Sequence, residues 1–151
     1  MPRLLADAML GKLARWLRLL GYDTVYMQDE DAAIAHRARA EGRVLLTRDR
    51  ELAERRGLTT VYVRSQILEA QLAQVVTAVG ALPDEMGPRC MRCNVSLVDA
   101  SKADAARQVP PYVVRTHERF QECPECGRMF WKGTHWQDIV ERIEDALSDK
   151  A

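Results

Sequence analysis

The chain has 151 residues, 47% of them hydrophobic and 29% charged, and its 22 basic and 22 acidic side chains give a net charge of zero. This length supports one hydrophobic core with a smaller appendage, and this composition excludes an intrinsically disordered protein. No apolar run approaches the ~18 residues of a membrane span and no export signal is recognisable, so we expect a cytoplasmic protein without a membrane partner.

The first half of the chain alternates between short apolar runs and longer amphipathic runs. Strands are predicted at 3–6, 24–27, 43–46 and 59–63, and helices at 8–20, 32–41, 50–56 and 65–79. On the first helix, apolar residues recur on one face, from Met9 to Leu20, and on the fourth the apolar stripe begins at Ile67. Strands that alternate with helices in this way predict an α/β fold with a parallel sheet flanked by helices.

The composition changes at 80–88, where glycine, proline and acidic residues predict a linker. We therefore expect an α/β domain over 1–85 and, over 86–151, a cysteine-containing module followed by an amphipathic helix at 136–147. Within this module we predict a strand at 112–115. The aromatic residues of 130–136 are expected to pack the module or hold it against the first domain, with base stacking by Trp131 or Trp136 as the alternative.

All four cysteines occur in two pairs, each with two residues between its members: Cys90, Cys93, Cys123 and Cys126. This spacing is typical of a four-thiolate structural Zn²⁺ site, since one tight turn directs both sulfurs of a pair to one metal ion. Asn94 and Gly127, which follow the pairs, tolerate the positive φ of such a turn. Two disulfides would require an exported protein, and a redox pair would require a helix start after a strand.

Three aspartates, Asp7, Asp31 and Asp49, each follow a predicted strand and precede a helix. The carboxyl ends of parallel strands lie along one edge of the sheet, so these carboxylates are expected to meet there. Oxygen ligands of this kind suit Mg²⁺ or Mn²⁺, although each aspartate taken alone is more simply explained as a helix N-cap. Thr47, two residues before Asp49, is expected to face the same cleft.

The polar face of the first predicted helix carries Lys12, Arg15 and Arg18. These residues begin one turn from Asp7 and could hold the phosphates of a substrate strand. The alternative is an ordinary solvated helix face.

Several segments together resemble the Mut-seven C-terminal RNase family, a PIN-like nuclease domain followed by a zinc ribbon. They are 5–7, 17–23, 42–49, 89–94, 123–127 and 130–136. The resemblance implies a PIN-like sheet, an acidic metal site and action on RNA. It matches Asp7 and Asp49 to family acids and favours Asp31 as the middle acid, with Asp29 as the alternative. Glu51 is the nearest candidate for a fourth acid.

These observations predict a ribonuclease in which Asp7, Asp31 and Asp49 hold catalytic Mg²⁺ or Mn²⁺. Its substrate contacts would come from Thr47 and from the basic face of the first helix. One alternative is a non-catalytic RNA-binding or ribosome-associated adaptor. Another is a toxin-like protein that binds a partner through its last helix.

Overall fold

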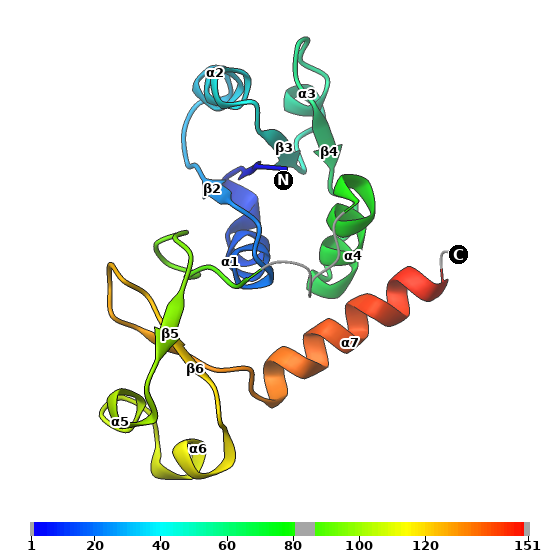
Figure 1. Ribbon diagram of the computed structural model, residues 1–151. Coiled ribbons are helices and arrows are strands. Elements are labelled where there is room, and N and C mark those ends of the chain that lie inside the picture. Colours follow the sequence, from blue (N-terminus) through cyan, green and yellow to red (C-terminus); the bar gives the residue numbers. More distant parts are fainter. Residues whose placement is uncertain (1, 81–86, 150–151) are drawn as a thin grey trace.

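A computed structural model of the protein describes residues 2–80 and 87–149 (Figure 1). Most of the predicted linker at 80–88 lies outside these described residues. None of the described helices is both long enough and apolar enough to cross a bilayer.

The first half of the chain forms the predicted parallel sheet, with helices between its strands. Its elements are β1 (Leu4–Ala6), η1 (Ala8–Leu10), α1 (Gly11–Leu20), β2 (Thr24–Tyr26), α2 (Asp31–Glu41), β3 (Val44–Thr47), α3 (Arg50–Ala53), β4 (Thr60–Tyr62) and α4 (Leu68–Val79). The strand order is β2-β1-β3-β4, and every neighbouring pair is parallel. Ala6 at the end of β1 is level with Tyr26 on β2 and Leu46 on β3, so the three strands end within one residue of one another.

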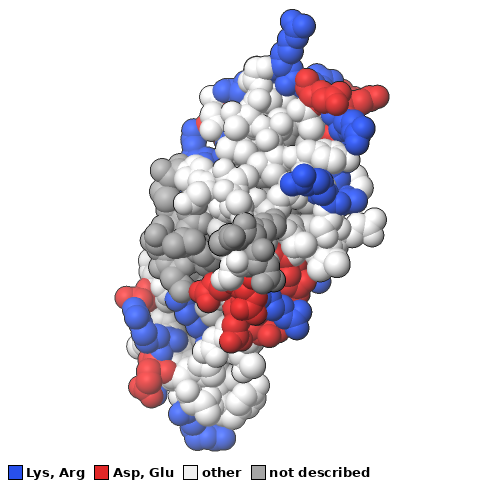
Figure 2. Space-filling model, turned by 90° about the vertical axis from the view of Figure 1, so that its right-hand side faces the viewer, with Lys and Arg blue, Asp and Glu red and all other residues white. Residues whose placement is uncertain are grey.

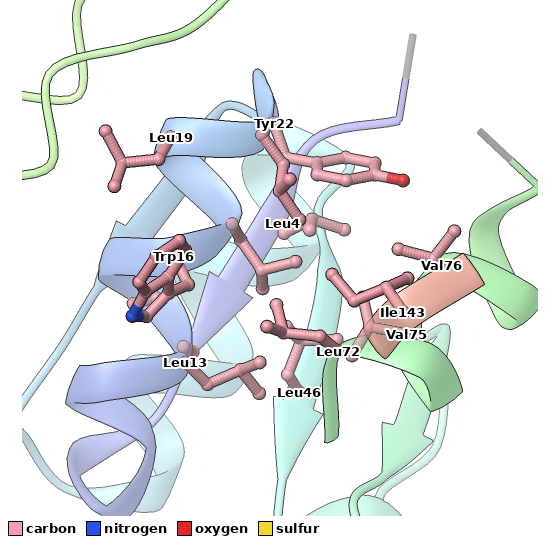
Figure 3. Packing of buried hydrophobic residues seen from close by; sticks show 14 of the residues in the cluster. Leu4, Leu13, Trp16, Leu19, Tyr22, Leu46, Leu72, Val75, Val76 and Ile143 are labelled. Atoms are coloured by element: carbon pink, nitrogen blue, oxygen red, sulfur yellow. The ribbon is translucent and has the colours of Figure 1, made fainter. Parts of the chain in front are cut away.

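The two faces of the sheet pack against different helices, because neighbouring residues of a strand point to opposite faces. Leu4 and Leu46 contribute to a core cluster with residues of α1 and α4, and Figure 3 shows these side chains converging with Leu13 and Leu72. Leu45 belongs to the cluster on the opposite face, where α2 and α3 lie.

The start of the first helix differs from the prediction. A single turn of 3₁₀ helix, η1, precedes α1, and Met9 is 69% exposed rather than buried. A 3₁₀ turn has three residues per turn instead of 3.6, so Met9 does not lie in line with the buried face of α1. Ile67, predicted on the apolar stripe of the fourth helix, precedes α4 and is 63% exposed. Both of these core assignments are therefore wrong.

The second half contains a small antiparallel sheet in the order β5-β6-β7. Its elements are β5 (Val98–Ala100), α5 (Lys102–Ala105), α6 (Pro111–Thr116), β6 (Phe120–Glu122) and β7 (Met129–Phe130). The strand predicted at 112–115 is wrong, because these residues lie in α6. Pro111 stands in the first turn, where its fixed φ favours a helix, and Val113 packs with Phe120. We call residues 87–133 the ribbon.

The last helix, α7 (Thr134–Asp149), packs across α4 (Figure 1). Its residues Trp136, Ile139 and Ile143 belong to the same core cluster as Leu4 and Leu46, and Ile143 has no exposed surface. The apolar face of α7 is therefore occupied by the α/β part of the protein. The division of the chain into two domains at residue 85 remains a prediction. The helix α7, which was assigned to the second domain, contributes to the core of the α/β part.

Candidate functional site

The centre of the sheet has the topology that places ligand sites in open α/β folds. From β1 the chain goes to β2 on one side and then crosses to β3 on the other side, so the strand order reverses between β1 and β3. At such a reversal the connections diverge and leave a crevice beyond the carboxyl ends of the strands. Asp7 directly follows β1, and Thr47 is the last residue of β3. We call this part of the molecule the acidic edge.

A chain of hydrogen bonds joins two of the predicted acids. The Thr47 hydroxyl donates to Asp7 Oδ2 and accepts from the backbone N–H of Asp49 at 2.9 Å. Asp7 Oδ1 accepts from the Met9 N–H at 3.2 Å. Asp49 Oδ1 accepts from the Leu52 N–H at 3.2 Å. Asp7 and Asp49 therefore have fixed positions on either side of the Thr47 hydroxyl.

The charge of Asp7 is disfavoured where it lies. Its side chain is buried, and this loss of hydration raises the pKa of the carboxyl above its usual value. The hydrogen bonds from Thr47 and Met9 lower the pKa, while the charges of Asp49 and Asp31 raise it further. Asp7 is therefore close enough to both other acids to be affected by their charge, and a bound cation would relieve that repulsion.

The third predicted acid lies at the start of α2. Asp31 is the first residue of this helix and is half-buried, and its carboxylate caps no helix, unlike those of Asp7 and Asp49. Asp29, the alternative, is exposed and accepts from the N–H of Glu30 at 2.7 Å. Glu51, the candidate fourth acid, is exposed on α3. The N-cap alternative therefore accounts for one hydrogen bond of Asp7 and one of Asp49, but it does not account for the position of Asp31.

The donor chemistry at the acidic edge fits a hard divalent cation. Among the described side chains of residues 2–80 and 87–148, no three carboxylates have oxygens that all lie within 4.8 Å of one another. Mg²⁺, however, is commonly bound through one or two carboxylates and keeps several of its waters. Each Asp7 oxygen accepts only one of the hydrogen bonds described above, so each keeps a lone pair with which it could bind such an ion.

The predicted substrate-binding residues have different surroundings. Lys12 is exposed, and Arg15 is exposed with Nε 3.5 Å from the carbonyl of Gly11. Arg18 is half-buried, and its Nε and Nη1 donate to backbone carbonyls, at 2.8 Å in each case. Thr47 is fully buried, so its hydroxyl serves Asp7 and the backbone of Asp49. This positioning role of Thr47 was not predicted from the sequence, which indicated that Thr47 faces the same cleft as Asp49 and contacts the substrate.

The four cysteines come together as predicted. Their sulfur atoms all lie within 4.8 Å of one another, and Cys90 Sγ is 3.7 Å from Cys126 Sγ. A disulfide requires about 2.05 Å. Two sulfurs bound at about 2.3 Å to one tetrahedral Zn²⁺ are about 3.8 Å apart. The distances therefore fit a four-thiolate zinc site, and all four cysteines are free of disulfides in the structure.

The two cysteine turns, which we call knuckles, have the same backbone geometry. In the first, residues 90–94, the Asn94 N–H donates to the carbonyl of Cys90 at 2.9 Å. In the second, residues 123–127, the Gly127 N–H donates to the carbonyl of Cys123 at 2.9 Å. Asn94 and Gly127 have φ values of 60° and 75°, which confirms the predicted left-handed turns.

The thiols are not equivalent in their acidity. Burial opposes ionisation of Cys123, but N–H groups of the second knuckle outweigh it and lower the pKa of this thiol to about 7. Burial and the neighbouring sulfurs raise the pKa of Cys93 to about 12. Without a cation the cluster therefore resists a second negative charge, and a bound Zn²⁺ would supply the positive charge that four thiolates require.

The first knuckle is fixed to the α/β part by side chains from both sides. Asn94 Oδ1 accepts from the Thr24 N–H at 3.0 Å, and Asn94 Nδ2 donates to Asp23 Oδ1 at 2.8 Å. Arg18 Nη1 donates to the carbonyl of Met91. Burial opposes ionisation of Asp23, but the bonds from Arg43 and Asn94 outweigh it and lower the pKa of this carboxyl. These hydrogen bonds hold the cysteine cluster beside α1.

The aromatic residues after the second knuckle pack the ribbon onto the α/β part, as predicted. Trp136 lies edge-on to Phe130, with ring centroids 5.8 Å apart, and it is buried in the main core cluster. His135 lies edge-on to Trp16 of α1 at 5.1 Å. The base-stacking alternative is therefore unsupported for Trp136.

One comparison with known proteins gives a match. A family model described as the Mut7-C RNAse domain matches residues 2–143, which include the sheet, the three acids and all four cysteines. No curated protein and no solved structure matches the chain significantly.

Proposed function

The chain belongs to the Mut7-C RNAse domain family, and we propose that it is a ribonuclease that hydrolyses RNA phosphodiester bonds with Mg²⁺ or Mn²⁺ at the acidic edge. The observation that carries this proposal is the buried Asp7, which is joined through Thr47 to Asp49 and whose pKa is raised by burial and by two further acids. A carboxyl with a raised pKa that lies among other acids at the strand-end edge of an open α/β sheet is a candidate for a catalytic site.

The residues of the acidic edge would have separate roles. A divalent cation bound there would lower the pKa of an attacking water and offset charge on the phosphate. Asp7 would be its central ligand, with Asp49 and Asp31 completing the acidic set. Thr47 would orient the Asp7 carboxylate by donating to Oδ2, and the Asp49 carboxylate is oriented by its bond to the N-terminus of α3.

Two basic residues of α1 suit phosphate contacts beside this edge. Lys12 and Arg15 are exposed within the first turns of the helix, close in the chain to Asp7. Contacts of this kind position a nucleic acid without reading its sequence. Arg18 suits a structural role instead, because its guanidinium already holds backbone carbonyls of the first knuckle.

The decisive variant is Asp49→Asn, assayed with labelled RNA and Mn²⁺. Asparagine still caps α3, so the fold should be retained while cleavage falls by at least about 10²-fold. Asp99→Asn, which makes the same charge change at an exposed position on β5, is the matched control and should cleave at the parent rate. Full activity in Asp49→Asn would remove the proposed mechanism.

The same assay identifies the middle acid. Asp31→Asn should lose activity as Asp49→Asn does. Asp29→Asn should retain activity, because Asp29 is exposed and its carboxylate accepts from the neighbouring N–H of Glu30. The reverse result would transfer the role to Asp29.

A second candidate function is an RNA-binding adaptor without turnover. It is favoured by the absence, among the described residues, of three carboxylates whose oxygens lie near enough to one another to share an ion. RNA binding by the parent chain without cleavage at any Mn²⁺ concentration would support the adaptor and contradict the nuclease.

The ribbon is proposed to carry one structural Zn²⁺ on Cys90, Cys93, Cys123 and Cys126. Because structural zinc contributes directly to folding, Cys90→Ala should unfold the ribbon. Retention of one zinc per chain in a Cys90→Ala, Cys123→Ala double variant would show that these cysteines are not the ligands.

A further inference from the structure

A groove of about 560 Å³ lies between α1 and the ribbon. Gly11 and Arg15 of α1 line one side, and Arg92 of the first knuckle and Arg128 after the second knuckle line the other. From Gly11 to Arg18 the helix rises about 10 Å, at about 1.5 Å per residue. The volume lies in the range of ligand-binding pockets.

One end of this groove adjoins the acidic edge. Tyr26 and Gln28, at and just beyond the end of β2, also line the groove. Tyr26 Oη donates to the carbonyl of Ala8 at 2.7 Å and accepts from Gln28 Nε2 at 2.8 Å. Ala8 immediately follows Asp7, so the groove leads from the neighbourhood of Asp7 along α1 to the zinc site.

The groove concentrates positive charge on a protein with no net charge. Four arginines line it, and none of its described lining residues is acidic. Arg15, Arg92 and Arg128 form no ion pair with any described side chain of residues 2–80 or 87–148, whereas Arg43 bonds to both Asp23 and Glu41. By contrast, the face shown in Figure 2 carries both signs of charge and no continuous basic surface. The groove is therefore a local site for an anion.

The arginines could instead serve the zinc site, since four thiolates and one Zn²⁺ carry two negative charges. Arg18 fits that role, because it is half-buried and donates to the Met91 carbonyl. Burial lowers the pKa of its guanidinium, and the charges of Cys90 and Cys93 offset part of that effect. Arg92 and Arg128 are exposed, and their guanidinium groups form no hydrogen bond with the sulfurs of the described cysteines. Two guanidinium groups therefore remain available to a ligand.

We propose that this groove holds the phosphate backbone of a single RNA strand, with Arg92 and Arg128 of the ribbon as phosphate contacts opposite Arg15. The inference rests on the proposed ribonuclease function, because the bound strand is the substrate that reaches Asp7. A guanidinium matches phosphate geometry with paired N–H donors, and a basic groove that follows the backbone is the usual means of binding single strands. The ribbon is then half of the substrate-binding surface as well as a structural module.

The test measures the affinity of the zinc-loaded full chain for a fluorescent single-stranded RNA, without Mg²⁺ or Mn²⁺, over a range of salt concentrations. The Arg92→Ala, Arg128→Ala double variant should bind about 10-fold more weakly. Its salt slope should be smaller by about 1.4, because each phosphate that an arginine neutralises on a single strand adds about 0.7 to the slope. Lysine at both positions should retain the parent salt slope. Arg107→Ala, Arg119→Ala is the matched control, since both arginines are exposed elsewhere on the ribbon.

Parent-like affinity and salt slope in the alanine double variant would overturn the proposal. So would an equal reduction in the control pair, tighter binding of double-stranded RNA than of the single strand, or loss of zinc from the alanine variant with RNA affinity unchanged. Because binding is measured without the catalytic cation, the result is independent of cleavage. If Asp49→Asn still cleaves RNA but the groove variant binds RNA more weakly, only the catalytic assignment is wrong. If Asp49→Asn does not cleave RNA but the groove variant binds RNA as the parent does, only the groove proposal is wrong.

Discussion

Asp7 is a carboxylate that the fold holds in an unfavourable place. Burial and two neighbouring acids raise its pKa, and its hydrogen bonds from Thr47 and Met9 offset only part of this effect. A group whose pKa is higher in the folded than in the unfolded state is stabilising when protonated. That contribution is present at low pH and is lost as the pH rises through the folded-state pKa. At neutral pH the metal-free protein is therefore destabilised by the Asp7 charge.

We predict that Asp7→Asn is at least as stable as the parent at pH 7 in the absence of Mg²⁺ and Mn²⁺. Asparagine removes the charge, and the Thr47 hydroxyl can reverse its bond to suit the amide. The stability difference should shrink as the pH falls toward 4, because the parent carboxyl then becomes neutral. Urea titrations of both proteins at several pH values measure this. A clearly less stable Asp7→Asn at pH 7 would contradict it.

At the scale of residues, the sequence predicted positions better than roles. Asp7 and Asp49 could be found because each follows a strand, and strand ends are visible in the pattern of apolar residues. The role of Thr47 depends on which strand lies beside β1, and β3 is that neighbour only in the folded sheet. Arg18 had the correct spacing for a basic helix face, but its partners, the carbonyls of Met91 and Arg92, are more than 70 residues away in the chain.

At the scale of elements, the first knuckle has its position fixed by one residue with two functions. Asn94 has a positive φ, and its side chain bonds both to the N–H of the buried Thr24 and to Asp23. The turn alone was predictable from the cysteine spacing. Its contact with β2 was not, because the sequence does not indicate which surface the ribbon covers.

We predict that Asn94→Ala lowers the free energy of unfolding by about 1–3 kcal/mol at saturating zinc. Alanine adopts positive φ less readily and leaves the Thr24 N–H without its partner. Asn94→Gly separates the two effects, since glycine adopts this φ freely, and its destabilisation should be smaller. Equal stability of Asn94→Ala and the parent in chemical denaturation would contradict this account of the knuckle.

The incorrectly predicted elements have local physical causes. The sequence Tyr112-Val113-Val114 suggests a strand, but Pro111 before it starts a helix that buries Val113. The bond from the Met9 N–H to Asp7 accompanies the 3₁₀ turn that precedes α1. Such preferences of single residues compete with periodicity, and short segments are where they prevail.

At the scale of the whole molecule, the last helix of the chain packs against its first elements. The helix α7 packs across α4, and its residues share a core cluster with β1, β3 and α1 (Figure 1). The amphipathic pattern predicted the helix and its inward face, but not which surface that face would cover. With the ribbon held by Arg18 and Asn94 as well, the groove has two walls whose relative position is fixed.

We predict that Ile143→Ala lowers the free energy of unfolding of the full chain by about 2–5 kcal/mol, because this fully buried side chain fills the core beside β1 and α4. Ile67→Ala is the matched control: Ile67 is 63% exposed, and its effect should stay within about 0.5 kcal/mol. Thermal or denaturant unfolding gives both values. Similar small effects for the two variants would show that α7 does not stabilise the α/β part.

The most direct test of the ribonuclease account is to locate Mn²⁺ in a crystal of the zinc-loaded protein by anomalous scattering. The account predicts Mn²⁺ density at the acidic edge, bonded to Asp7 and to at least one of Asp49 and Asp31, and no such density in Asp7→Asn. Mn²⁺ bound only elsewhere, or no Mn²⁺ at millimolar concentration in a protein that cleaves RNA, would contradict it.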